Sequence, residues 1–127
     1  MLSINNLTVK AGDKVILKDF SLSIKLNEIH TLMGLNGSGK STICKVLMGD
    51  KNYEVVSGTI TFKDKDLLTL DTVERARMGL YLVSQNPIEV EGVKNSEMLK
   101  LALEQRTGKN INIFEFSKIM NNVCERL

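Results

Sequence analysis

The sequence predicts an α/β fold in which a small antiparallel sheet is followed by alternating strands and helices. Near the N-terminus, apolar and polar residues alternate, as is typical of strands with one buried face. An almost continuous apolar run over residues 29–33 then leads through a glycine-rich loop into apolar residues at helical spacing. Beyond residue 95 the apolar spacing is again helical. These three observations predict an α/β fold.

The composition predicts a folded soluble protein. Of the 127 residues, 43% are hydrophobic and 25% are charged, and the net charge of +2 forms no basic stripe. We therefore expect no nucleic-acid partner. No apolar run approaches 18 residues and the first residues lack signal-peptide features, which favours a cytoplasmic protein without direct membrane insertion. Cys44 and Cys124 are far apart, so we expect two reduced, packed thiols.

The first half of the chain should contain short strands and one helix. A turn is expected at 11–14, and Gly49 should end the helix that carries Ile43, Val46 and Leu47. The 29–33 run suits a strand covered on both faces, as in a parallel sheet. The predicted strands span residues 2–9, 15–17, 20–26, 29–33 and 57–62.

The second half should begin with a short capped helix. Asp71 is expected to be its N-cap, with Glu74 completing a capping box and Gly79 marking its end. An apolar strand over 80–83 then leads directly into Gln85. Two further helices are expected: one is capped by Asn95 or Ser96 and ended by Gly108, and the last has apolar residues at helical spacing from Ile113 to Leu127.

The loop Gly34-x-x-x-x-Gly39-Lys40-Ser41 satisfies the P-loop pattern for phosphate binding. Backbone N–H groups of a loop with little side-chain bulk can surround phosphate oxygens. Lys40 would reach the β- and γ-phosphates and Ser41 would ligate Mg²⁺, while Thr42 would start the helix behind them. An ordinary glycine-rich turn is the weaker alternative. The predicted binding residues are Gly34, Leu35, Asn36, Gly37, Ser38, Gly39, Lys40, Ser41 and Thr42.

Two other polar residues are ambiguous from sequence alone. Gln85 follows a predicted strand and could sense Mg²⁺ and the γ-phosphate. A glutamine at such a position is more often only a polar residue that marks the end of the strand. His30 lies inside the 29–33 run and is expected to be a core or rim histidine, because we find no partner His, Cys or carboxylate at useful spacing.

The loop "MGLNGSGKST" resembles that of ABC ATPases, and the order of elements is similar to an ABC nucleotide-binding domain. Within that superfamily, the chain from Leu2 to about Leu103 resembles SufC-like ATPases of the SUF iron–sulfur cluster assembly system. The stretches concerned are "EIHTLMGLNGSGKST" (28–42), "DKNYEVVSGTITFKDKDLLTL" (50–70), "ERARMGL" (74–80) and "QNPIEVEGV" (85–93). The last of these best separates the chain from transporter ATPases.

The resemblance implies a P-loop NTPase with bound ATP and Mg²⁺. Residues 1–127 would form a partial ABC ATPase domain, with a β subdomain and partial RecA-like core over 1–85 and the start of the helical subdomain over 86–127. Lys40 and Gln85 would be catalytic, and Gln85, as the Q-loop glutamine, would join Ser41 at the metal.

The resemblance also implies partners. A SufB–SufD-like scaffold would dock through residues 86–106, and the full-length family would dimerise with ATP. The alternatives are an ATP-binding fragment of an ABC transporter and a non-catalytic remnant that at most binds nucleotide.

Several departures from the family pattern matter. We find no signature motif, no Walker B element and no switch histidine, all of which we expect in a part that would follow residue 127. The chain should therefore hold phosphate better than it cleaves it, and 29–33 should expose apolar surface. Asn27 and Asp64 replace glycines but tolerate left-handed turns. The usual adenine-stacking aromatic is absent, which leaves Val9, Lys10 or Val15 to touch the base.

Overall fold

The computed structural model describes every residue except 86–90 and 127. Its contacts divide the chain into two units, which are described separately. The first comprises Met1–Ala76 with Leu80–Leu82, and the second comprises Arg77–Gly79 with Val83–Leu127. The functional subdivision at residue 85 stays a prediction.

The first unit is built on a four-stranded antiparallel sheet with the order β2-β1-β3-β4. The strands are β1 (Leu2–Ala11), β2 (Lys14–Ile24), β3 (Glu54–Phe62) and β4 (Lys65–Asp66). The predicted strand at 57–62 is confirmed and begins three residues earlier. Lys63 and Asp64 join β3 to β4 with φ values of 49° and 64°, and Asn27 has a φ of 63°. The prediction that Asn27 and Asp64 accommodate left-handed turns is thus confirmed.

The two strands predicted at 15–17 and 20–26 are one strand, so that division was wrong. Lys18 and Asp19 read as a polar break in the sequence, but β2 continues through them with register shifts against β1. Asp19 has a φ of 50°, and its N–H donates to Thr8 Oγ1 at 3.3 Å. An irregularity of this kind bends a strand without ending it.

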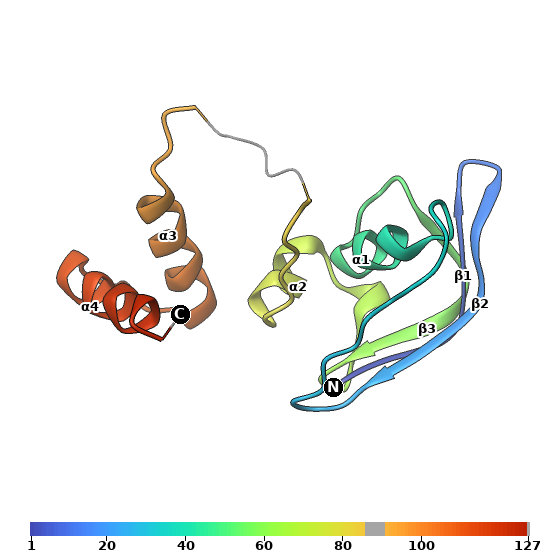
Figure 1. Cartoon of the computed structure of the whole chain (residues 1–127), viewed down its shortest axis with the longest axis horizontal. Coiled ribbons are helices and arrows are strands. Elements are labelled where there is room, and N and C mark those ends of the chain that lie inside the picture. The colour runs from blue at the N-terminus through green and yellow to red at the C-terminus, as the bar shows by residue number, and fades with distance from the viewer. Residues whose placement is uncertain (86–90, 127) are drawn as a thin grey trace. The chain divides into compact units, whose positions relative to one another are not determined.

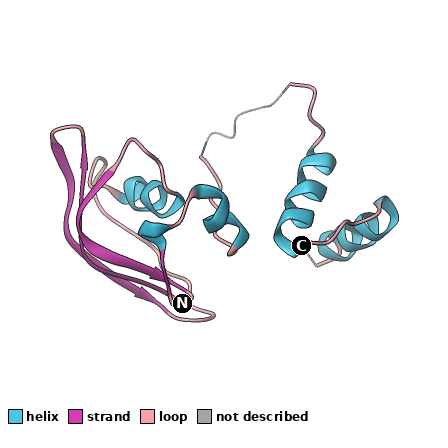
Figure 2. Ribbon diagram, turned by 180° about the vertical axis from the view of Figure 1, so that it is seen from behind, coloured by secondary structure: helices cyan, strands magenta, loops and turns pink. Residues whose placement is uncertain are grey.

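Helix α1 (Lys40–Met48) packs on one face of the sheet, as Figures 1 and 2 both show. Ile4, Leu7 and Ile60 from the strands are at most 1% exposed, and Ile43 and Val46 reach them from the helix. Burying an aliphatic side chain of this size contributes about 1.5–3 kcal/mol. This apolar layer holds α1, and with it the preceding loop, against the sheet.

The predicted strands at 29–33 and 80–83 are absent, and both predictions were wrong. A strand needs a hydrogen-bonding neighbour, and in the described part of the chain no other strand pairs with either segment. The predicted exposure of apolar surface is confirmed: Ile29 and Met33 are 95% and 89% exposed. Tyr81 and Val83 are each 79% exposed, whereas Leu80 packs against the core.

The capping box predicted at residue 71 is confirmed. After a short 3₁₀ turn η1 (Leu67–Thr69), helix α2 spans Thr72–Arg77. The Glu74 N–H donates to Asp71 Oδ1, and the Asp71 N–H donates back to Glu74 Oε2. Gly79, with a φ of 100°, follows the helix end.

The second unit contains helices α3 (Asn95–Thr107) and α4 (Ile113–Cys124) (Figure 2). Gly108 ends α3 in a left-handed conformation, as predicted, and its N–H donates to Glu104 O at 2.8 Å. The N-cap of α3 is Lys94, not Asn95 or Ser96, and it makes no side-chain cap bond. Asn112 caps α4 by accepting from the Glu115 N–H.

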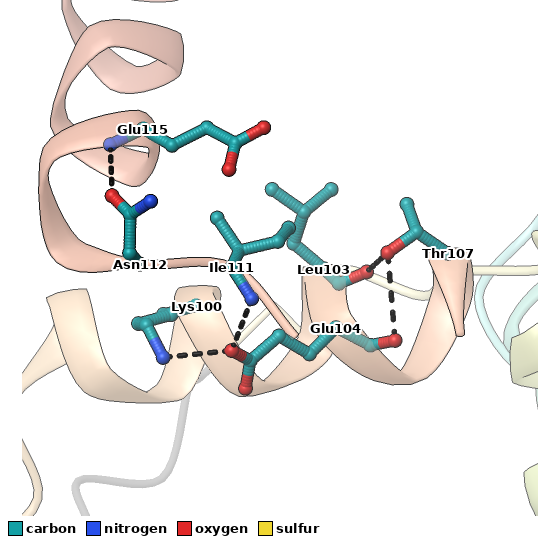
Figure 3. A network of polar contacts seen from close by, with 7 residues as sticks. All are labelled: Lys100, Leu103, Glu104, Thr107, Ile111, Asn112 and Glu115. Atoms are coloured by element: carbon teal, nitrogen blue, oxygen red, sulfur yellow. Dashed lines mark hydrogen bonds and ion pairs between the residues drawn. The ribbon is translucent and has the colours of Figure 1, made fainter. Parts of the chain in front are cut away.

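A polar network joins the two helices of this unit (Figure 3). Glu104 Oε1 accepts from Lys100 Nζ at 2.7 Å and from the Ile111 N–H at 2.8 Å. Beside it, Ile111 and Phe116 are each 6% exposed. The carboxylate of Glu104 therefore ties the start of the α4 segment to α3.

The thiols differ from the expectation in one respect. Both cysteines are free, but only Cys44 is half-buried, whereas Cys124 lies exposed near the end of α4. The prediction of a packed thiol was wrong for Cys124, because α4 turns that position to solvent. Separately, none of the helices in the described ranges is both long and apolar enough to cross a bilayer.

Candidate phosphate-binding site

The glycine-rich loop leads directly into α1. Gly39 is the N-cap, and the helix begins at Lys40 rather than at Thr42, so the predicted start was two residues late. The Ile43 N–H donates to Gly39 O and closes the first turn. Thr42 is only 6% exposed, because its side chain faces the core beside Ile43. The backbone N–H of Thr42, rather than its side chain, is therefore the group suited to contact a ligand.

Two of the three loop glycines, Gly37 and Gly39, have a left-handed backbone conformation. Gly39 has a φ of 90°, and a Cβ there would lie 2.6 Å from Leu17 Cδ2 of β2. Gly37 has a φ of 82°, but nothing lies within 4 Å of the corresponding position. The loop thus packs closely against β2 at Gly39 and has free space beside Gly37. A ligand could therefore approach the loop backbone at Gly37.

Lys40 is the first residue of α1, and its side chain folds back over the loop that precedes the helix. Its Nζ donates to Gly34 O and to Leu35 O, each at 2.8 Å. The Ser38 N–H donates to Leu35 O at 3.2 Å, which makes the loop compact. The positive charge of Lys40 therefore lies at the loop that the P-loop pattern assigns to phosphate.

The N-terminus of α1 is suited to an anion. A helix leaves its first N–H groups without internal partners and carries partial positive charge at that end. Gly39 supplies no side-chain cap, and the first turn holds no acidic residue. Ser41 is exposed in the same turn, and its role as a metal ligand stays a prediction. Glycine backbone, Lys40 and the helix N-terminus together fit the phosphates of a nucleotide.

Not all of the predicted site residues belong to the first unit. Gln85 is exposed at a bend and belongs to the second unit, so its role in catalysis and at the metal stays a prediction. Of the segment 86–106 predicted to dock partners, 86–90 lies outside the described residues. The remainder includes α3, whose large exposed apolar residues are Met98, Leu99 and Leu101.

The β1–β2 hairpin flanks the loop and carries the three residues predicted as possible contacts of the adenine base. Val9 is fully buried in the core, so contact through its side chain is excluded and that alternative was wrong. Val15 is 53% exposed, and Lys10 forms an ion pair with Glu54 at 3.2 Å. Ile16 O lies 3.3 Å from where a Cβ of Gly39 would be. Lys10 and Val15 remain as alternatives.

His30 has a partner that the sequence reading missed. Its Nε2 lies 3.0 Å from Glu28 Oε2, the same oxygen that accepts from the Lys25 N–H at 2.8 Å. The Lys25 hydrogen bond and then His30 lower the pKa of the Glu28 carboxyl. His30 is exposed, so the expectation of a core histidine was wrong, and so was the inference that no carboxylate lies at useful spacing.

Arg75 is a buried charge that sequence reasoning did not single out. It is 5% exposed, and its guanidinium donates to the carbonyl oxygens of Val46 at 2.8 Å, Leu47 at 3.1 Å and Leu70 at 2.9 Å. Burial lowers its pKa, while the charges of Asp66 and Asp71 oppose that shift. Nothing in the spacing of α2 marks this arginine as inward-facing.

A glycine loop that delivers a lysine to the N-terminus of a helix packed on a sheet defines a P-loop nucleotide-binding protein. The ABC transporter family matches residues 17–127, and the chain belongs to this family. The predicted fold class, a P-loop NTPase of the ABC type, is thereby confirmed.

The relatives confirm the resemblance stated from the motifs. The chain is 43% identical over 124 residues to the probable ATP-dependent transporter SufC of Escherichia coli, which covers 94% of this chain and 50% of the relative. It is 47% identical over 106 residues to the probable ATP-dependent transporter ycf16 of Trieres chinensis, and this alignment covers 84% of this chain and 42% of the relative. It is 39% identical to the probable ATP-dependent transporter slr0075 of Synechocystis, and this alignment covers 94% of this chain and 48% of the relative. The chain spans about half the length of these curated relatives.

Proposed function

We propose that the chain is the ATP-binding part of a SufC-like ABC ATPase that supports iron–sulfur cluster assembly in the cytoplasm. The observation that carries this proposal is the loop 34–42, in which Lys40 and the uncapped N-terminus of α1 converge. The similarity to SufC supports the particular branch of the family.

In this proposal Lys40 exchanges its acceptors when nucleotide binds. Its Nζ now donates to Gly34 O and Leu35 O, and it would turn to the β- and γ-phosphate oxygens. The loop N–H groups would bind the remaining oxygens, and Ser41 with Gln85 would hold Mg²⁺. The bound metal would supply charge neutralisation at the phosphates. Lys40 orients the phosphates and stabilises their charge.

Binding, rather than turnover, is the activity that we assign to these 127 residues alone. Phosphoryl transfer depends on a second metal-supporting carboxylate and on a residue that positions water. The sequence contains neither a Walker B element nor a switch histidine. In the assembled ATPase, those groups and a partner's signature motif would complete the site upon ATP-dependent dimerisation.

The partners in this proposal are SufB–SufD-like scaffold subunits that dock on residues 86–106. Within that segment, Met98, Leu99 and Leu101 on α3 are 49%, 40% and 59% exposed, which suits an apolar contact. An ABC permease is the alternative partner. Co-purification of the chain with a soluble scaffold pair supports the first, and complex formation with a permease instead would contradict it.

The decisive binding test is isothermal titration calorimetry with MgATP. The wild-type chain should bind, and Lys40→Ala should weaken binding by roughly 10- to 100-fold, because it removes charge-assisted hydrogen bonds of about 1.5–3 kcal/mol. Lys45→Ala, an exposed lysine in the last turn of α1, is the matched control and should bind like wild type. Equal affinity of the Lys40 and Lys45 variants would contradict the assignment of the loop.

A further inference from the structure

Arg75 reaches across from α2 to the end of α1 that lies farthest from the phosphate loop. Its Nη1 donates to Val46 O at 2.8 Å and Leu47 O at 3.1 Å, and its Nε donates to Leu70 O at 2.9 Å. All of these groups belong to the first unit. One side chain therefore connects the last turn of α1 to the segment that precedes α2.

The hydrogen bonds of Arg75 satisfy carbonyl groups at the C-terminal end of α1. The last carbonyl groups of a helix have no internal partners and carry partial negative charge. The Gly49 and Asp50 N–H groups cover Lys45 O and Val46 O, and the guanidinium of Arg75 covers Val46 O and Leu47 O. Hydrogen bonds from a charged donor are stronger than neutral ones. Arg75 thus serves as the C-terminal anchor of this helix.

Gly49 makes room for the anchor. A Cβ at that position would lie 3.2 Å from the Cζ of Arg75 and 3.3 Å from its Nη1. The guanidinium therefore lies directly over the glycine that ends α1. The local sequence at residue 49 and the side chain at residue 75 are fitted to one another.

The helix transmits this anchoring to the phosphate loop. α1 has nine residues, which corresponds to a length of about 13 Å. Gly39 fixes its N-terminus against Leu17, while Ile43 and Val46 pack on the sheet. Apolar packing resists separation from the sheet more than it resists sliding along it, whereas the directional bonds of Arg75 define the position along the helix axis.

We propose that Arg75 is a positioning residue for nucleotide binding, acting through α1 on the loop that carries Lys40. The inference rests on the proposed function of that loop. Arg75 touches neither the loop nor the predicted ligand, so its effect is mechanical: it keeps the N–H groups at the N-terminus of α1 where phosphate oxygens would meet them.

The test compares MgATP affinity in Arg75→Gln, Arg75→Lys and wild type, at a temperature where circular dichroism shows each chain fully folded. Arg75→Gln should raise the dissociation constant about tenfold, which corresponds to about 1.4 kcal/mol. Arg75→Lys should restore part of the affinity, because an ammonium keeps the charge but lacks the planar fork. Arg77→Gln, an exposed arginine on the same helix, is the matched control and should bind like wild type.

Amide hydrogen exchange provides a second readout. In Arg75→Gln the hydrogen-bonded amides of α1, from Ile43 to Met48, should exchange faster, while those of β1 should keep their rates. A purely global loss of stability would instead accelerate the slowest-exchanging amides of both elements together. Folded Arg75→Gln with a dissociation constant within about twofold of wild type would overturn the inference.

Should Arg75→Gln fail to fold, Gly49→Ala replaces it. The added Cβ would lie 3.2 Å from Arg75 Cζ and would shift the guanidinium by a few tenths of an ångström, and the φ of 80° strains the end of α1 as well. An unchanged affinity in folded Gly49→Ala would then overturn the inference. A wild-type chain that binds no MgATP would contradict the proposed function. Exchange rates at residues 43–48 unaffected by Arg75→Gln would overturn the anchoring itself.

Discussion

Asp71 and Glu74 exchange two hydrogen bonds at the start of α2. The Glu74 N–H donates to Asp71 Oδ1 at 2.7 Å, and the Asp71 N–H donates to Glu74 Oε2 at 2.9 Å. α2 is only six residues long, so these bonds satisfy a large share of its free N-terminal groups. The same short helix carries Arg75.

Removing this cap should destabilise the first unit. Asp71→Ala is expected to lower the free energy of unfolding by about 1 kcal/mol, the usual value of an N-cap carboxylate. Urea denaturation followed by circular dichroism measures the change. Asp71→Asn keeps an acceptor oxygen at the same position and should lose less. Equal losses in both variants would show that the charge, rather than the cap bond, is what matters.

Gly39 and Gly37 should respond differently to the same substitution. Both have positive φ, so alanine costs roughly 1–2 kcal/mol of backbone strain at either site. At Gly39 the new Cβ would also lie 2.6 Å from Leu17 Cδ2, whereas at Gly37 it meets nothing within 4 Å. Gly39→Ala should therefore destabilise by at least about 1 kcal/mol more than Gly37→Ala. Thermal denaturation of the two variants tests this, and equal midpoints would contradict the contact with β2.

Ser41 should determine the benefit of Mg²⁺ to ATP binding. Ser41→Ala is expected to weaken affinity roughly tenfold in the presence of Mg²⁺ and little in its absence, because only the hydroxyl–metal bond is lost. Ser41→Thr retains a hydroxyl and serves as the control. Calorimetric titrations of wild type and both variants, each with Mg²⁺ and with a chelator, provide the six affinities needed. A loss of the same size under both conditions would assign Ser41 to phosphate rather than to metal.

The α3–α4 junction should weaken in acid. The Lys100 hydrogen bond, followed by that from the Ile111 N–H, lowers the pKa of Glu104 below its ordinary value of 4.5. A lowered folded pKa means that this carboxylate stabilises the junction fully above 4.5 and loses its effect as the pH falls through the folded pKa. An NMR titration of the Ile111 amide should show that midpoint, and Glu104→Gln should abolish it. A midpoint at or above 4.5 would contradict the network of Figure 3.

Local features of the fold were predictable because their causes are local. The capping box at Asp71, the left-handed turns at Asn27 and Asp64, and the helix stop at Gly108 each follow from a few neighbouring residues. The P-loop pattern is local for the same reason, since it encodes one turn of backbone and the start of one helix.

The features that sequence reasoning missed depend on distant partners. The apolar runs at 29–33 and 80–83 have strand composition, but a strand forms only where another strand supplies hydrogen bonds. Arg75 looks like a solvated helix residue until the carbonyl groups of Val46 and Leu47, almost thirty residues earlier, are placed beside it. The single strand β2 likewise depends on Thr8 to accommodate Asp19.

The fit between Gly49 and Arg75 has a consequence for the evolution of related chains. A Cβ at residue 49 would lie 3.2 Å from Arg75 Cζ, so the guanidinium would have to shift by a few tenths of an ångström to make room for it. The two positions should therefore covary: homologues with a side chain at the first should have the arginine at the second less often than homologues with glycine.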